Sequence, residues 1–217
     1  MNKGLISSMI SNWQEMKIKH IIQLREIGLL HKGDDEKNMM VGALLAGIEY
    51  EKLLDMRLDA TKEIMDNTSF LLEKPKPSKA RNKYIINGKD YYLLKNADDL
   101  TVAQYIDFQQ LYNDGFEAHP REMLSIFLVP KGHKYNDGYD KQEVIEDMGE
   151  LGVEEALGIV DFFMKRCAKS TKRMMAYSLA TIKVLKFLHP KEKERLKATE
   201  LELNLIQEYL CEYGFHL

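Results

Sequence analysis

The sequence predicts a mainly α-helical protein, built as a duplicated multi-helix unit with one β-hairpin insertion and a long C-terminal helix pair. Three observations lead to this fold class. Apolar positions recur in the same order in two parts of the chain, and a single segment carries a strong hairpin signature. The last third has helical periodicity that ends at His189-Pro190 and that Ser170-Thr171 could interrupt.

The duplication emerges when the sequence is compared with itself at a shift of 84 positions. Three segments of the first part then coincide in apolar pattern with three of the second, the last pair after nine extra residues in the second copy. The pairs are Met16–Ile27 with Leu100–Leu111, Lys37–Leu45 with Arg121–Val129, and Leu58–Leu71 with Leu151–Met164. Because repetition of an apolar pattern preserves packing rather than chemistry, the pattern indicates a scaffold.

The first helical unit is expected over residues 1–73. A helix is predicted at 12–31 with Ser11 or Asn12 as its N-cap. Asp34 or Asp35 is expected to cap a second helix that runs through Ala46, where Gly47 stops it. Two short helices are expected near residues 49–56 and 59–72.

A basic linker and the hairpin occupy residues 74–98. The stretch from Lys74 to Lys79 carries two prolines and no acid, which is typical of an extended, solvated linker. In the following run, Asn87-Gly88 suits a type I′ turn between strands rich in aromatic and β-branched residues. Because a lone hairpin is marginally stable, it must pack on the helical body or on a neighbouring subunit.

The second helical unit is expected over residues 99–164. Asp99 or Thr101 can cap its first helix, and Thr101 with Gln104 fits a capping box for a helix that ends after Tyr112. Pro120 suits the first turn of the next helix, which Pro130 and Gly132 should end. A polar loop at 133–140 and a short helix near 141–148 follow, and a long helix begins at Val153.

Residues 165–217 form a basic long-helix extension and a C-terminal helix. Five cations fall on about two helical turns: Lys165, Arg166, Lys169, Lys172 and Arg173. They are interpreted either as a solvated helix face or as a surface facing nucleic-acid phosphates or an acidic partner.

No catalytic, cofactor-binding or metal-binding motif occurs in the 217 residues, so we expect a protein that is not an enzyme and uses no cofactor. The loop at 133–140 offers His133, Asn136, Asp137 and Asp140, but their spacing fits no calcium or zinc template and favours an exposed turn. The net charge is −3 and no apolar run approaches the length of a membrane helix, so no membrane contact is expected.

Protein contacts are the better expectation, because tyrosines and other apolar side chains gather in turns and at the chain end. The residues expected to contact an oligomer partner are Tyr84, Asn87, Gly88, Tyr91, Tyr135, Tyr139, Phe215 and Leu217.

Three stretches resemble structural proteins of tailed bacteriophages, crAss-like phages in particular: Tyr84–Tyr91, Leu100–Phe108 and Phe127–Asp140. The resemblance implies a virion protein of the neck or tail, made in the host bacterial cytoplasm. It implies a ring protein, or portal adaptor, that binds copies of itself and portal or other tail and ring proteins. The basic helix would then make non-specific contact with packaged DNA.

Two alternatives remain at this point. One is a tail-assembly chaperone that binds the tape-measure protein and is missing from the finished particle. The other is a sequence-independent DNA-binding protein that uses the basic helix and loses duplex affinity steeply with added salt.

Overall fold

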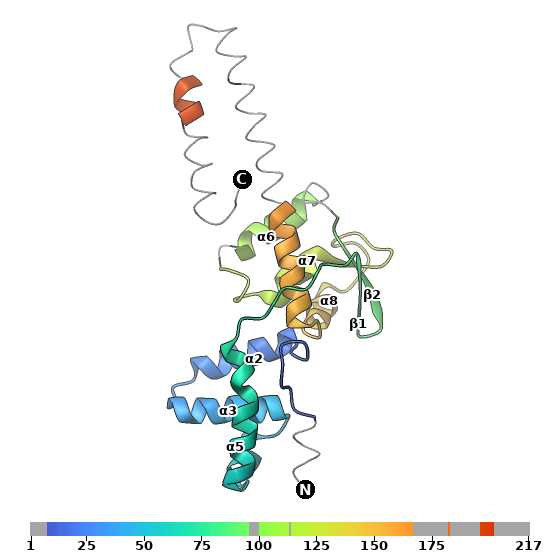
Figure 1. The fold of residues 1–217 in the computed structure, drawn as a ribbon. Coiled ribbons are helices and arrows are strands. Elements are labelled where there is room, and N and C mark those ends of the chain that lie inside the picture. Colours follow the sequence, from blue (N-terminus) through green and yellow to red (C-terminus); the bar gives the residue numbers. More distant parts are fainter. Residues whose placement is uncertain (1–7, 96–99, 113, 167–181, 183–195, 202–217) are drawn as a thin grey trace. The chain divides into compact units, whose positions relative to one another are not determined.

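A computed structural model describes residues 8–95, 100–112, 114–166, 182 and 196–201 (Figure 1). These residues are mainly helical and include a β-hairpin, which confirms that part of the predicted fold class. The chain divides into two compact units, one of Met1–Leu93 with Thr101–Ile159 and one of Leu94–Leu100 with Val160–Leu217. The hairpin strands and most of the two helical units expected from the sequence belong to the larger compact unit.

The first half of the larger unit contains α2 (Ile18–Leu29), α3 (Asp34–Ala46), α4 (Tyr50–Leu54), α5 (Leu58–Asn67) and the 3-10 helix η1 (Thr68–Leu72). The helix α3 lies at the centre, in contact with α2, α4, α5 and η1. It ends at Ala46 as predicted, because Gly47 adopts the left-handed conformation with φ of 66° and caps it.

The first helix begins later than the predicted residue 12. The Asn12 side chain accepts hydrogen bonds from the backbone N–H groups of Gln14 and Glu15, at 3.0 and 3.1 Å, and so closes a separate turn. Trp13 lies in that turn, and its indole N–H donates to the carbonyls of Phe70 and Glu73. The turn is thereby attached to η1, and α2 starts only at Ile18.

The predicted hairpin is confirmed. The strands β1 (Lys83–Ile86) and β2 (Lys89–Leu93) pair in an antiparallel register, with Ile86 opposite Lys89. Asn87 and Gly88 have φ of 50° and 76°, the two positive angles that a type I′ turn requires.

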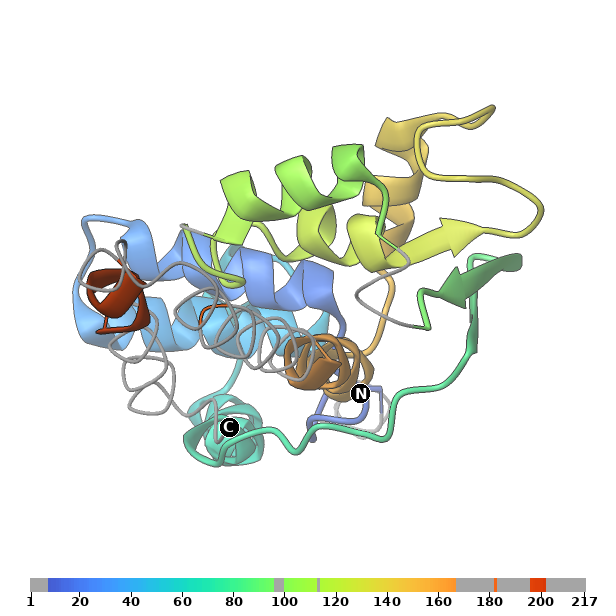
Figure 2. The ribbon, with the colours of Figure 1, turned by 90° about the horizontal axis from the view of Figure 1, so that it is seen from above.

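A third strand, β3 (Leu128–Pro130), pairs antiparallel with β2 and was not predicted (Figure 2). The preceding helix α7 (Pro120–Phe127) begins with Pro120 as expected but ends three residues before Pro130. Proline disfavours helical backbone at the residue before it, and the apolar run continues as a strand that joins the sheet. The hairpin therefore packs on its own chain.

The second half of the larger unit also contains α6 (Val102–Tyr112) and α8 (Lys141–Met148), and a further helix begins at Val153. The capping box at the start of α6 is confirmed. The N–H of Thr101 donates to Gln104 Oε1 at 3.0 Å, and the N–H of Gln104 donates to Thr101 Oγ1 at 3.2 Å. The helix α7 lies against both α6 and α8.

The two halves meet where the residues before α2 pair with the residues before the helix at 153–166. Lys17 and Gly152 form an antiparallel bridge, the N–H of Ile18 donates to the Leu151 carbonyl at 3.0 Å, and the N–H of Val153 donates to the Met16 carbonyl at 2.9 Å. The ammonium groups of Lys17 and Lys19 both pair with Glu150. We call this pairing of residues 16–19 with 149–153 the internal junction.

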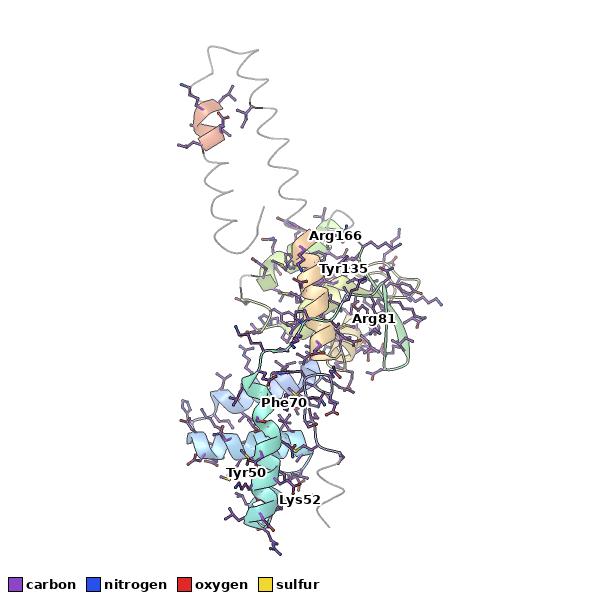
Figure 3. All side chains as sticks on the ribbon, in the orientation of Figure 1. Tyr50, Lys52, Phe70, Arg81, Tyr135 and Arg166 are labelled. Atoms are coloured by element: carbon purple, nitrogen blue, oxygen red, sulfur yellow. The ribbon has the colours of Figure 1, made fainter. Side chains whose placement is uncertain are left out.

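The linker at residues 74–82 is extended as predicted, but it is not fully solvated. The N–H of Ser78 donates to the Glu154 carbonyl at 2.9 Å, and Arg81 forms an ion pair with Glu155. Figure 3 labels Arg81 beside the hairpin. Its guanidinium also lies over the Tyr84 ring, 5.1 Å from the ring centre. These contacts hold the linker along the start of the helix at 153–166, where its positive charge is partly neutralised.

Candidate functional site

Two of the tyrosines expected to face a partner are buried in the chain itself. Tyr84 and Tyr91 lie on the side of the hairpin that faces the core and are almost inaccessible to solvent. Asn87, in the turn, is held by a hydrogen bond to Asp147 of α8. The expectation that Tyr84 and Tyr91 contact another subunit therefore needs correction, because the chain's own core covers both side chains, whereas Asn87 remains exposed at the turn. Gly88, exposed at the turn, offers a partner no side chain.

Asp147 is a buried carboxylate, only 5% exposed, that gathers three donors from the hairpin. Its oxygens accept hydrogen bonds from Asn87 Nδ2 at 2.7 Å, Lys89 Nζ at 2.7 Å and the Tyr91 hydroxyl at 2.5 Å. Lys89 also pairs with the exposed Glu143, one helical turn earlier on α8. Because both oxygens of this buried carboxylate accept hydrogen bonds from the hairpin, Asp147 holds the hairpin against α8.

The ionisation of this cluster follows from its contacts. Burial opposes the charged form of Asp147, but the hydrogen bonds from Lys89, Tyr91 and Asn87 outweigh it, so the pKa of the carboxyl lies below its ordinary value. Burial first, and then the hydrogen bond to Asp147, raises the pKa of Tyr91. The cluster keeps one protonation state around neutral pH, which suits a structural role rather than proton transfer.

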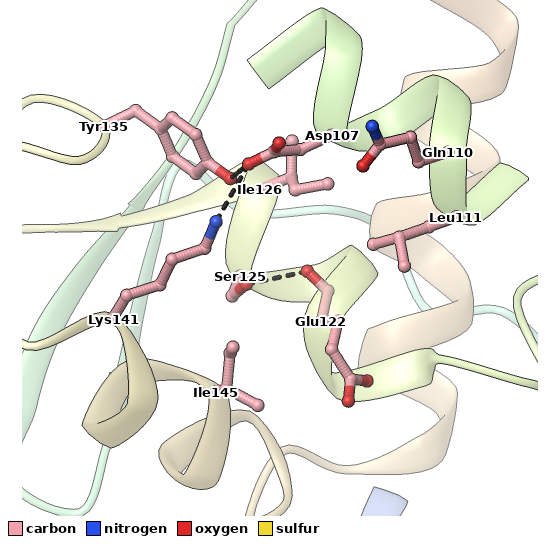
Figure 4. A pocket seen from close by; sticks show the side chains of 9 residues that line it. All are labelled: Asp107, Gln110, Leu111, Glu122, Ser125, Ile126, Tyr135, Lys141 and Ile145. Carbon is pink, nitrogen blue, oxygen red and sulfur yellow. Dashed lines mark hydrogen bonds and ion pairs between the residues drawn. The ribbon is translucent and has the colours of Figure 1, made fainter. Parts of the chain in front are cut away.

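A cavity of about 220 Å³ lies between α6, α7 and α8 (Figure 4). On one side of it the Tyr135 hydroxyl donates to Asp107 Oδ2 at 2.6 Å, and Lys141 Nζ donates to the same oxygen at 2.8 Å. The other lining residues are Gln110, Leu111, Glu122, Ser125, Ile126 and Ile145.

Three of the polar side chains that line this cavity, Asp107, Tyr135 and Lys141, are hydrogen-bonded to one another. The hydrogen bonds from Lys141 and Tyr135 lower the pKa of Asp107, and burial followed by the hydrogen bond to Asp107 raises the pKa of Tyr135. Tyr135 is itself buried, so this tyrosine fastens the loop at 133–140 to α6 rather than facing a partner. The expectation of a partner contact at Tyr135 is corrected accordingly.

The rest of that loop forms the expected exposed turns. Asn136 and Gly138 have positive φ, Asp140 caps α8 by accepting from the N–H groups of Gln142 and Glu143, and His133 lies edge-on to Tyr139 at 5.8 Å. Tyr139 is half-buried, so of the two loop tyrosines it is the one that a partner could reach.

Of the basic residues expected to face DNA, only Lys165 and Arg166 belong to the described part of the chain. Lys165 pairs with Asp161 at 2.7 Å, and the Arg166 guanidinium lies 5.1 Å from the centre of the Phe162 ring. Lys169, Lys172 and Arg173 lie outside the described residues, as do Phe215 and Leu217 at the chain end.

An apolar stripe on α6 is a further candidate surface, which the sequence analysis did not single out. Val102, Tyr105, Ile106 and Tyr112 are all exposed. The i, i+3, i+4 spacing of Val102, Tyr105 and Ile106 places these three side chains on one side of the helix. Tyr112 instead follows the buried Gln104 and Phe108 at intervals of four residues, and its ring centre lies 5.4 Å from that of Phe108. A contiguous exposed apolar face of this kind indicates a protein contact.

Comparisons with protein families, with curated proteins and with solved structures found no match for this chain. Across the described ranges, no three His, Cys, Asp or Glu side chains lie together in a way that could hold a metal ion. Within the same ranges, no helix combines the length and the apolar character needed to cross a membrane.

Proposed function

We propose that this chain is a non-enzymatic structural protein of a tailed bacteriophage particle, a neck or tail ring component that assembles into a symmetric oligomer. The observation that carries the proposal is the exposed apolar stripe on α6, because such a surface is buried by another protein in a stable assembly. The sequence resemblance to phage structural proteins supports placing this assembly in the virion. Portal or neighbouring ring proteins would then be further partners.

The polar clusters support a structural role over catalysis. Asp147 and Asp107 each accept hydrogen bonds from a lysine and a tyrosine within the same chain. Their pKa values are lowered and those of the tyrosines are raised, which leaves these groups poorly matched to acid–base work near neutral pH.

The tail-assembly chaperone is the second candidate, because an exposed apolar helix face would also suit transient binding of another chain. The DNA-binding candidate is less favoured, because Lys165 is already paired with Asp161 on its own helix. A ring component should be present in purified particles at a fixed copy number, whereas a chaperone should be missing from them.

Native mass spectrometry of the purified protein over a concentration series tests the proposal. A closed oligomer, or a ladder of species leading to one, is the expected result. A protein that stays monomeric and is missing from purified particles would overturn it.

A further inference from the structure

Two of the most exposed apolar side chains of the larger unit begin helices. Val102 is the first residue of α6 and is 76% exposed, and Leu58 is the first residue of α5 and is 85% exposed. Leu54, at the end of α4 just before Leu58, is exposed as well. Such positions leave both apolar groups and first-turn N–H groups without partners inside their own helices.

The counterparts of these residues in the sequence repeat are buried. At the shift of 84 positions Val102 corresponds to Ile18, the first residue of α2, which is 1% exposed. Leu58 corresponds to Leu151 in the sequence comparison, or to Val153 when the helix starts are matched, and these are 3% and 4% exposed. Either register pairs an exposed residue with a buried one.

These buried counterparts contact each other. At the internal junction the N–H of Ile18 donates to the Leu151 carbonyl, and the N–H of Val153 donates to the Met16 carbonyl. The start of the first helix of one repeat thus pairs with the start of the last helix of the other repeat. Within the described part of the chain, the corresponding elements of the two repeats, the starts of α6 and α5, show no such backbone pairing.

We infer that the start of α6 in one copy of the chain binds the start of α5 in the next copy, so that the internal junction is repeated between chains. This inference rests on the self-assembly proposed above and names the surfaces that carry it. The two surfaces differ, so the contact is head-to-tail, and successive copies close into a ring when the rotation between them permits.

The local geometry at the two helix starts supports the correspondence. The N-cap N–H of Lys17 donates to the His20 side chain three residues on, and the N-cap N–H of Thr101 donates to the Gln104 side chain in the same relation. At α2 the N–H groups of Ile18 and Lys19 donate to the carbonyls of Leu151 and Gly149, and at α6 the residues in the same two positions are Val102 and Ala103.

The charges of the junction are not repeated. Thr101 and Ala103 stand where Lys17 and Lys19 pair with Glu150. The contact between chains therefore depends on backbone pairing and apolar burial, and its strength should change little with salt.

Two single substitutions and their mixture test the inference. Val102→Asp and Leu58→Asp each place a carboxylate in one of the two surfaces and should weaken self-association about a hundredfold or more. Leu72→Asp is the matched control, because Leu72 is 91% exposed on η1, outside both surfaces. Native mass spectrometry reads the species, and circular dichroism verifies that each variant is folded.

The mixture separates a head-to-tail contact from a symmetric one. The Val102→Asp chain keeps its α5 surface and the Leu58→Asp chain keeps its α6 surface, so the two should form a 1:1 dimer and nothing larger. Assembly of either variant like the wild type, or a mixture that stays monomeric, overturns the inference while leaving wild-type assembly intact. A wild-type chain that is monomeric at every concentration overturns both the inference and the self-assembly beneath it.

Discussion

Replacing Asp147 by asparagine should destabilise the fold by about 2 kcal/mol, although the shape of the side chain hardly changes. The substitution removes the charge that two donors share, the Lys89 ammonium and the Tyr91 hydroxyl, both bonded to Oδ2. Hydrogen bonds to a charged group are each about 1 kcal/mol stronger than neutral ones, and two are affected. The third donor, Asn87, can turn its amide and keep a bond.

The exposure of the partners limits the loss. Lys89 is 43% exposed and retains its ion pair with Glu143, so it is not left uncompensated. Tyr91 is buried, and its hydroxyl depends on residue 147 for an acceptor. Most of the loss in stability should therefore come from the weakened hydrogen bond of Tyr91. The double variant Tyr91→Phe, Asp147→Asn should then lose less free energy of unfolding than the sum of the losses of the two single variants.

Urea unfolding at neutral pH measures the change in the free energy of unfolding. Circular dichroism and the fluorescence of Trp13, the only tryptophan in the chain, detect the transition. Glu143→Gln is the matched control, because it contacts the same ammonium from a side chain that is 59% exposed and should change the free energy of unfolding by less than about 0.5 kcal/mol. A loss below about 0.5 kcal/mol for Asp147→Asn would refute the argument that the buried charge locks the hairpin.

Three further outcomes are expected. Gly88→Ala should lower the free energy of unfolding in urea by about 1–2 kcal/mol, because the φ of Gly88 is 76°. Gly28→Ala in α2 is the control and should be neutral or stabilising, because nothing lies near the added Cβ and alanine favours helices. Equal effects of the two substitutions would contradict the backbone argument. Gly158→Ala should destabilise the protein, although alanine favours helices, because a Cβ at this position would collide with the Ser78 carbonyl. A raised melting temperature of this variant would contradict the predicted collision. The pKa of His20 is lowered from 6.5 by burial and then by two neighbouring lysines. The unfolded chain therefore binds a proton at His20 more readily than the folded one, and stability should fall as the pH drops below about 6.5. His20→Gln should make the melting temperature depend less on pH in this range.

Local signals in the sequence predicted the local structure well. Asn87-Gly88 specified its turn, Gly47 ended α3, and Thr101 with Gln104 formed the expected capping box. Each of these signals acts within a few residues, through backbone conformation or a single side-chain hydrogen bond. For this reason each could be identified without knowledge of the tertiary structure.

The features that depend on distant residues were missed. Leu128 and Val129 continue an apolar run whose periodicity does not separate a buried strand from the end of a helix. Asp147 looks like any surface carboxylate on a helix until its three donors, about 60 residues earlier, are brought against it. The burial of Tyr84 and Tyr91 follows from the same packing, so the sequence alone could not separate core tyrosines from contact tyrosines.

The internal junction also bears on how the chain is made. The ion pair between Lys17 and Glu150 joins residues 133 positions apart, so the start of α2 has no partner until most of the chain has been synthesised. At bacterial or eukaryotic elongation rates that interval lasts roughly 7–27 s, far longer than helix formation takes. During it, the nascent α2 presents the same kind of unpaired helix start that the finished protein retains on α6. A neighbouring copy whose own internal junction has not yet closed could occupy that start through its residues 149–153, so synthesis on crowded ribosomes favours exchange of the first half between copies.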